Sequence, residues 1–182
     1  MCAGNCDAAK SAGLIWRTKD AAFAILWDPI AVSIARAAGP GARLAMRVGG
    51  KMGVLSGRPL DLDVTVTAVT DDLYQRHWGV GSSLGPAAAL RAGGIDVVIV
   101  SRRHQVFSPD VFSGLGIDPL ARKLLVVKST NHFRAEFQRI AAAILYVAPP
   151  NVFTNVPFKR IPRPKWPLDP DIFDPKERSA TA

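Results

Sequence analysis

The sequence predicts an α/β or α+β domain built on a mixed β-sheet, with a few helices and an extended, proline-rich C-terminal tail. Three observations lead to this prediction. The 182 residues match the length of one domain, and 48% of them are apolar, enough to form a core. Residues 21–27 are an unbroken apolar run, typical of a strand buried on both faces. Residues 60–68 alternate apolar and polar side chains, the period of a strand with one exposed face.

The chain divides into three predicted parts. Residues 1–18 form an irregular lead-in, residues 19–150 the α/β domain, and residues 151–182 a tail that belongs to the same domain. Of the 14 prolines, 8 fall in residues 149–182, and proline at that density precludes a regular helix or strand. We therefore expect an extended tail that wraps over the domain.

The first half of the domain is predicted to contain one helix among several strands. Asp28 is a favoured N-cap and Pro29 a favoured first helical residue, so a helix is expected to begin there. Gly39 is expected to end it. In order, the expected elements are a strand at 21–27, a helix at 30–38, a strand at 44–48, a loop at 52–59, a strand at 60–68 and a returning strand at 73–78.

The second half is predicted to contain a hairpin, two helices and two further strands. Gly93-Gly94 predicts the tight turn of the hairpin, and Ser108-Pro109-Asp110 repeats the helix-starting pattern. In order, the expected elements are a loop at 79–86, strands at 87–91 and 95–100, a short helix from 108 to about 114 or 116, a strand at 124–127, a helix that follows residues 128–131 and runs to about 140, and a last strand at 142–147.

The composition narrows the classes of partner. There are 23 Lys and Arg against 15 Asp and Glu, a net charge of +8, but the basic residues are scattered along the chain. We therefore expect no nucleic-acid partner, although residues 158–166 combine basic and aromatic side chains. No run of 18 apolar residues and no signal-peptide pattern occurs, so the prediction is a cytoplasmic protein without a membrane partner. Cys2 and Cys6 alone cannot complete a zinc site.

The clearest candidate site lies in residues 126–137, where a buried strand leads into a predicted helix. Lys128 places a positive charge beside the unpaired N–H groups of that helix, and Ser129 adds a hydroxyl. Such a site suits a carboxylate or a phosphate. His132 falls in the first turn and could donate a proton or a hydrogen bond, whereas Arg134 lies further along. The residues leave a second interpretation open, in which Ser129 only caps the helix and Lys128 is solvated.

A second candidate site follows the strand at 95–100. Five polar residues after a buried strand suit a binding loop, and a solvated surface loop is the alternative. The alternation of an extended chain predicts Arg102 and His104 on one side, with Arg103 and Gln105 on the other.

Other sequence signals are weaker. Lys51 follows two glycines that allow a close approach of the backbone, so it could meet an anion, but a plain turn is the simpler explanation. His77, His104 and His132 are far apart in the sequence, and no metal site is expected from them alone. Residues 79–85 read G-x-G-x-x-x-G, which departs from the dinucleotide-binding pattern, and no G-x-S-x-G motif supports a serine nucleophile.

Several segments together carry a resemblance to a known family. The chain resembles the C-terminal domain of the microcystinase C (MlrC) family of metallopeptidases over roughly residues 18–170. The most specific parts are the KS-x-x-HFRA-x-F stretch and the R-P-x-W-P-L-D stretch of the tail. The matching segments are DAAFAILWDP (20–29), RVGGK (47–51), LRAGGIDVVIVSRRHQVFSPDVFSGLGIDP (90–119), LLVVKSTNHFRAEF (124–137) and RIPRPKWPLD (160–169).

The resemblance implies a function that composition and spacing do not. Family members resemble zinc-dependent metallopeptidases that cut linearised microcystin or other small peptides and amides. The resemblance places the metal ligands, which are His and Asp residues, and a catalytic Glu in a longer N-terminal domain that this sequence lacks. Zinc is thus the expected cofactor of the full-length family, and no metal ligand is expected in this chain. The family's D-N-x-G-G-G-x-x-G-D stretch has no match here, where the start reads AGNCDAAKSAG.

The leading hypothesis is a C-terminal domain that forms the substrate-binding wall of such a metallopeptidase and is expected to be inactive alone. Its expected partners are the N-terminal metal-binding domain and a small peptide or amide substrate, whose carboxylate or scissile carbonyl would meet the candidate site. The alternative is a non-catalytic binding or partner module for small acidic ligands or for a separately encoded catalytic half. The predicted substrate-binding residues are Lys128, Ser129, His132, Arg134, Arg102, Gln105 and Lys51. His132 is in addition the candidate auxiliary catalytic residue.

Overall fold

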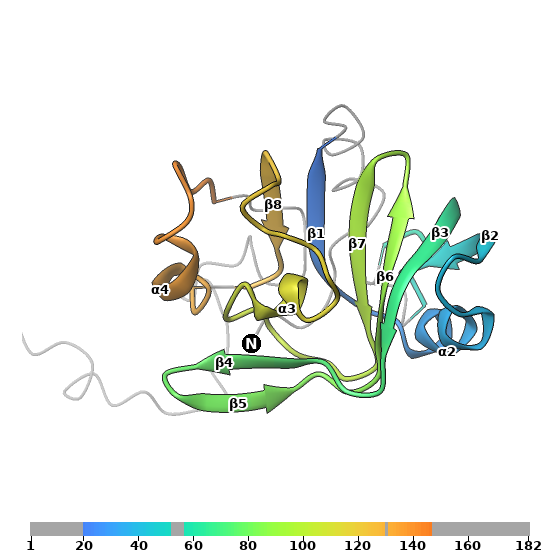
Figure 1. The fold of residues 1–182 in the computed structure, drawn as a ribbon, viewed down its shortest axis with the longest axis horizontal. Coiled ribbons are helices and arrows are strands. Elements are labelled where there is room, and N and C mark those ends of the chain that lie inside the picture. The colour runs from blue at the N-terminus through green and yellow to red at the C-terminus, as the bar shows by residue number, and fades with distance from the viewer. Residues whose placement is uncertain (1–19, 52–56, 130, 147–182) are drawn as a thin grey trace, which may run out of the picture.

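The computed structural model describes residues 20–51, 57–129 and 131–146, so the predicted lead-in and tail lie outside the described residues. Within the described part, a six-stranded mixed sheet carries a separate two-stranded hairpin and short helices (Figure 1). The elements are β1 (Ala21–Trp27), α2 (Pro29–Ala38), β2 (Arg43–Val48), β3 (Leu60–Thr70), β4 (Tyr74–His77), β5 (Val80–Ser83), β6 (Ala87–Ala92), β7 (Ile95–Val100), α3 (Asp110–Ser113), β8 (Leu124–Val127) and α4 (Arg134–Phe137). The predicted mixed sheet with few helices is confirmed.

The large sheet has the strand order β2-β3-β6-β7-β1-β8. Strand β1 pairs parallel with β7 on one side and with β8 on the other. The pairs β2–β3, β3–β6 and β6–β7 are antiparallel. The central strand β1 is buried over its first five residues, as its unbroken apolar sequence predicts. Strand β8 is only half-buried because it lies at the edge of the sheet in the described part. The carboxyl ends of β7, β1 and β8 therefore meet at one edge, where α/β sheets commonly bind ligands.

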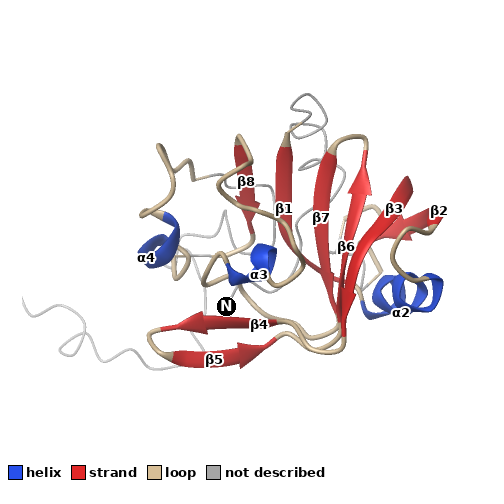
Figure 2. Ribbon diagram, in the orientation of Figure 1, coloured by secondary structure: helices blue, strands red, loops and turns tan. Residues whose placement is uncertain are grey.

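Apolar side chains cover both faces of the large sheet, against which the helices shown in Figure 2 pack. On one face, helix α2 packs its buried residues Ala31, Val32 and Ala35 against side chains of β2, β3 and β6. On the other face, Phe112 of α3 and Phe137 of α4 pack against alternate residues of β1, β6 and β7. The hairpin β4–β5 lies across the end of the sheet, and its connections Leu73 and Leu84 are fully buried in the second cluster. No helix in the described residues is long and apolar enough to cross a membrane.

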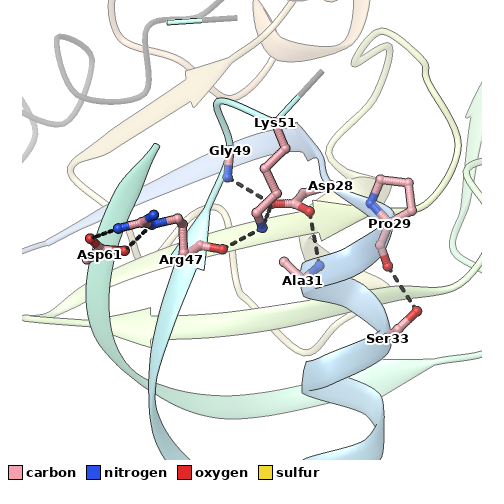
Figure 3. A network of polar contacts seen from close by, with 8 residues as sticks. All are labelled: Asp28, Pro29, Ala31, Ser33, Arg47, Gly49, Lys51 and Asp61. Carbon is pink, nitrogen blue, oxygen red and sulfur yellow. Dashed lines mark hydrogen bonds and ion pairs between the residues drawn. The ribbon is translucent and has the colours of Figure 1, made fainter. Parts of the chain in front are cut away.

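A buried aspartate starts helix α2, as the sequence predicts (Figure 3). Asp28 is only 2% exposed, and its Oδ1 accepts a hydrogen bond from the Ala31 N–H at 3.0 Å. Its Oδ2 accepts from the Gly49 N–H at 2.8 Å and from Lys51 Nζ at 2.6 Å. The Lys51 ammonium also donates to the Arg47 carbonyl. This carboxylate therefore fixes the start of α2 and the end of β2 to one point.

Three predicted elements differ in the structure. Residues 79–86 were expected as a loop, yet residues 80–83 form β5 because their backbone pairs with β4. The helix expected to run to about residue 140 is regular only over α4, and irregular turns continue to Ala141. Residues 142–146 form no strand, and Leu145 is 83% exposed. An apolar run of this length suits a strand or a turn equally, so periodicity alone misassigned it.

Candidate functional site

The candidate site lies at the edge where the parallel strands β7, β1 and β8 end. The Lys128 N–H donates to the Ala24 carbonyl at 2.8 Å and extends the pairing of β8 with β1. The Lys128 carbonyl in turn accepts from the Val106 N–H at 3.1 Å. This bond brings the loop that follows β7 beside the loop that follows β8. The two candidate segments that sequence reasoning treated separately therefore lie side by side.

Three of the predicted residues share one contact point, the side-chain carbonyl of Gln105. Its Oε1 lies 3.4 Å from Ser129 Oγ, which donates to it, and 3.3 Å from His132 Nδ1. Ser129 is half-buried and His132 is exposed, so the group opens to solvent. The hydroxyl of Ser129 therefore contacts Gln105, and the one-turn helix α4 has no side-chain cap. The helix start expected beside Ser129 lies further along the chain, because α4 begins at Arg134, and side chains of two loops form the group.

A glutamine that sequence reasoning missed fixes this loop in place. Gln75 of β4 is fully buried. Its Nε2 donates to the Gln105 carbonyl at 2.7 Å and lies 3.2 Å from His104 Nδ1. Its Oε1 accepts from the Phe107 N–H at 2.8 Å. The hairpin therefore positions the loop of Gln105 through one side chain whose amide is bound at both ends.

The three histidines of the chain, distant in sequence, gather around the ring of Phe107. The ring centroid of Phe107 lies 4.8 Å from that of His77, 5.0 Å from that of His104 and 5.5 Å from that of His132. His77 and His132 also contact each other edge to face at 6.0 Å. Because Phe107 occupies the space between them, the imidazoles face an apolar ring rather than a common point.

The ring of His77 lies between two aromatic rings. It stacks on Phe107 with an interplanar angle of 30°, and Trp78 stacks on it with centroids 4.3 Å apart at 24°. Both ring nitrogens of His77 are shielded from solvent and have no hydrogen-bond partner among the described residues. His77 therefore contributes a flat surface to the site.

The two arginines after β7 point to different neighbours. Arg102 Nη1 donates to Ser83 Oγ at 2.9 Å, and its side chain passes over Gly85. Arg103 places its guanidinium 5.7 Å from the centroid of the Trp27 ring at the end of β1. His104 contacts Gln75 of the hairpin. Arg102 and His104 thus both contact the hairpin, whereas Arg103 contacts the end of β1, in line with the predicted alternation. Arg102 therefore lies on the hairpin side of the site.

Two predicted residues take other places. Lys51 donates to Asp28 and Arg47, so the structure gives its ammonium a partner on the α2 side of the sheet. The close approach predicted for its glycines is real, because a Cβ on Gly50 would lie 2.3 Å from the Pro59 nitrogen. Arg134 is exposed at the start of α4.

The fold and this edge define the class of protein: an α/β domain that groups polar and aromatic side chains at the ends of parallel strands. The chain belongs to the MlrC C-terminus family, whose model matches residues 6–162. It is 33% identical over 145 residues to microcystinase C of a Sphingomonas species, an alignment that covers 80% of this chain and 29% of that protein. The chain thus spans less than a third of that relative.

A solved structure shows the same fold. It comes from Mesorhizobium sp. BNC1, and its title proposes that the protein is a metallopeptidase. The two superpose with a TM-score of 0.67 at 24% identity, covering 76% of this chain and 28% of that one. At this identity, the likeness establishes the fold.

Sequence reasoning missed Gln75, His77, Trp78 and Phe107. Each lies on the hairpin or on the loop after β7, and they meet only because the hairpin folds back across the sheet edge. One signal was available. A Trp-Gly pair between two short runs of strand-forming residues indicates a hairpin tip, because glycine readily adopts a positive φ there.

Proposed function

We propose that this chain forms the substrate-binding wall of a microcystinase C-like metallopeptidase that hydrolyses small peptides or amides. The observation that carries the proposal is the convergence of Gln105, Ser129 and His132 at the edge of the parallel strands. Membership of the MlrC C-terminus family supports it, as does the size of the relative, of which this chain matches 29%. In this proposal the other 71% supplies the catalytic partner domain.

Each side chain has a distinct part in the proposed site. Lys128 and Arg102 supply positive charge toward a peptide carboxylate, and His132 supplies a donor toward a carbonyl oxygen. Gln105 holds that imidazole through its contact at 3.3 Å, and Ser129 donates to the same Gln105 oxygen at 3.4 Å. His132 would act as an auxiliary group that stabilises developing charge, and the hydrolytic step would take place on the partner domain.

The metal of such a peptidase would be held outside the described part of this chain. Within residues 20–51, 57–129 and 131–146, no three His, Cys, Asp or Glu side chains are grouped to hold a metal ion. The histidines that lie closest to one another enclose Phe107, which excludes tetrahedral ligation at their centre. The described residues therefore do not fit a zinc centre, and their proposed role is to bind and orient the substrate.

Binding of a small peptide carboxylate to the 182-residue chain tests the proposal. We expect acetyl-dialanine to shift the NMR signals of Ser129 and His132, and its amide to bind more weakly. Lys128→Ala and His132→Ala should each weaken binding of the acid about tenfold, because a hydrogen bond to a charged group contributes roughly 1.5–3 kcal/mol. Lys123→Ala is the matched control, because it removes the same charge at the opposite end of β8.

Two results would contradict the proposal. One is equal binding of the acid and the amide that neither Lys128→Ala nor His132→Ala changes. The other is zinc-dependent peptidase activity of the purified chain itself, which would place the catalytic metal here instead of in a partner domain.

A further inference from the structure

The tip of the β4–β5 hairpin presents a tryptophan that the fold of the chain does not need. Trp78 is 78% exposed, although tryptophan is usually well buried. It occupies the two-residue turn between β4 and β5 with φ +50°, followed by Gly79 with φ +79°. A turn with two positive φ angles is of type I′, which favours Asn-Gly or Gly-Gly. A bulky residue in this conformation is uncommon, and residues held in such conformations cluster at functional sites.

Trp78 also ends a continuous stack that leads inward to the candidate site. Its ring lies on His77, the ring of His77 lies on Phe107, and Phe107 contacts His132 edge to face at 5.5 Å. The stack is held from beneath by buried Gln75, which bonds to the Phe107 N–H. The shielded nitrogens of His77 lack hydrogen-bond partners among the described residues, a cost that a purely structural position would avoid. The outer end of this stack is the exposed Trp78 ring.

We propose that Trp78, backed by His77 and Phe107, is a stacking subsite for an aromatic side chain of a peptide whose carboxylate or carbonyl occupies the site around His132. This assignment rests on the proposed function, since it names the class of peptide that the same wall takes. Continuity carries the argument, because one chain of ring contacts joins the exposed indole to His132. An aromatic ring laid on the indole adds one more member to a stack that is already formed.

Three small probes separate the stacking subsite from the polar site. Acetylphenylalanine amide carries the ring without a carboxylate, acetylalanine carries the carboxylate without a ring, and acetylphenylalanine carries both. We expect the amide of acetylphenylalanine to shift the indole N–H signal of Trp78 and the ring signals of His77 in the full 182-residue chain. Acetylphenylalanine should bind more tightly than either single-feature probe.

Trp78→Asn is the decisive variant. It creates an Asn-Gly turn, the preferred type I′ sequence, so the thermal midpoint should hold or rise. Binding of acetylphenylalanine should fall about fivefold, within the range measured for aromatic pairs. Binding of acetylalanine should not change. Trp78→Phe should keep part of the affinity, and Tyr74→Ala, which removes a 55% exposed ring of the same hairpin outside the stack, should keep all of it.

The outcomes distinguish the two proposals. Unchanged acetylphenylalanine binding in Trp78→Asn overturns the stacking subsite, as does equal binding of acetylphenylalanine and acetylalanine to the parent chain. Dilution-dependent Trp78 signals without any probe would also overturn it, because a second copy of the chain would then cover the indole. If acetylalanine fails to bind while acetylphenylalanine amide still shifts Trp78, the stacking subsite stands and the carboxylate site of the proposed function fails.

Discussion

The surroundings of Asp28 and of Phe107 lie at the ends of neighbouring strands, yet they are built in opposite ways. Asp28 is buried and bonded to two backbone N–H groups and one ammonium. Around Phe107, three imidazoles meet a ring, the nitrogens of His77 have no partner among the described residues, and Trp78 lies exposed with a positive φ. The first arrangement lowers the free energy of the folded chain. The second leaves buried ring nitrogens without a partner among the described residues and the ring of Trp78 exposed to solvent.

The two regions show that polar residues after a strand do not by themselves indicate a binding site. Each region has a lysine after a predicted strand, and the sequence makes Lys128 the clearer and Lys51 the weaker anion-binding candidate. The structure separates them, because the Lys51 ammonium is bonded to the carboxylate that starts α2. Lys128, by contrast, follows the edge strand directly beside the loop of Gln105. The two lysines therefore differ in their surroundings, because Lys51 is bonded to the carboxylate at a helix start and Lys128 follows β8 beside the loop that carries Gln105.

Removing the carboxylate of Asp28 should have the largest effect on stability. Asp28→Ala removes the cap of α2 and leaves the half-buried Lys51 ammonium without its carboxylate partner. We expect the free energy of unfolding to fall by about 3–5 kcal/mol, the cost of breaking a buried ion pair. Urea unfolding measures it. Asp63→Ala, at an exposed position of β3, is the matched control and should stay within about 0.5 kcal/mol of the parent.

Equal urea midpoints for these two variants would contradict the structural role of the Asp28 carboxylate. Asp28 would then be no more structural than an exposed carboxylate. Lys51→Met adds a finer distinction, because Asp28 keeps both of its backbone N–H bonds in that variant. Its loss of stability should be smaller than that of Asp28→Ala.

Gln75→Leu should have the next largest effect, and it acts on the second region. Leucine fills similar space but leaves the Gln105 carbonyl and the Phe107 N–H without the amide that binds them. Two unsatisfied groups should cost roughly 2–3 kcal/mol and loosen the loop that carries the site. Urea unfolding gives the cost, and the NMR signals of His104 and His132 report the loosening. Gln138→Leu, at an exposed position after α4, is the control.

In a second possible result, Gln75→Leu destabilises the chain but leaves the NMR signals of His104 and His132 unchanged. The amide would then stabilise the hairpin without positioning the site. Equal stability of Gln75→Leu and Gln138→Leu would contradict the role of Gln75 altogether.

Local signals let the sequence predict most of the scaffold. The apolar run of β1, the Asp28-Pro29 start of α2 and the alternation of β3 each depend on neighbours within a few residues, and the structure bears out all three. The run at 142–147 failed because its length and composition suit more than one local structure. The predicted start of α4 differs from the structure because the hydroxyl of Ser129 contacts Gln105 instead of capping the helix. A local sequence pattern does not predict that contact.

The site was less predictable because its geometry is non-local. His77, His104 and His132 come from three separate segments. The hairpin brings His77 to Phe107, and the pairing of the loops after β7 and β8 brings His132 there. Because the three histidines are far apart in the sequence, no metal site is expected from them. That separation does not predict that they meet around the ring of Phe107. Ser129, His132 and Gln105 were each named from strand-end placement, a rule that holds across α/β sheets.

The exposed pair of Arg47 and Asp61 offers the smallest effect and a reference for the buried carboxylate of Asp28. Arg47 donates two hydrogen bonds of 2.6 Å to Asp61 across β2 and β3 (Figure 3). These bonds lower the pKa of Asp61 below its ordinary value of 3.8. Because the folded state then binds a proton less readily than the unfolded state, the pair stabilises the fold above that value, and this contribution disappears as pH falls through the lowered pKa.

Asp61→Asn should therefore lower the urea midpoint slightly at about pH 6, and its difference from the parent should shrink as pH falls through the lowered pKa of Asp61. About 1 M NaCl should remove most of the difference at the higher pH, because salt screens exposed charges. A difference that does not shrink as pH falls would show that Asp61 stabilises the fold through packing rather than charge. Asp28→Ala is expected to keep most of its deficit in the same salt, because its partner groups are buried or half-buried. If salt erased both deficits equally, the distinction between a carboxylate enclosed by the fold and one open to solvent would be lost.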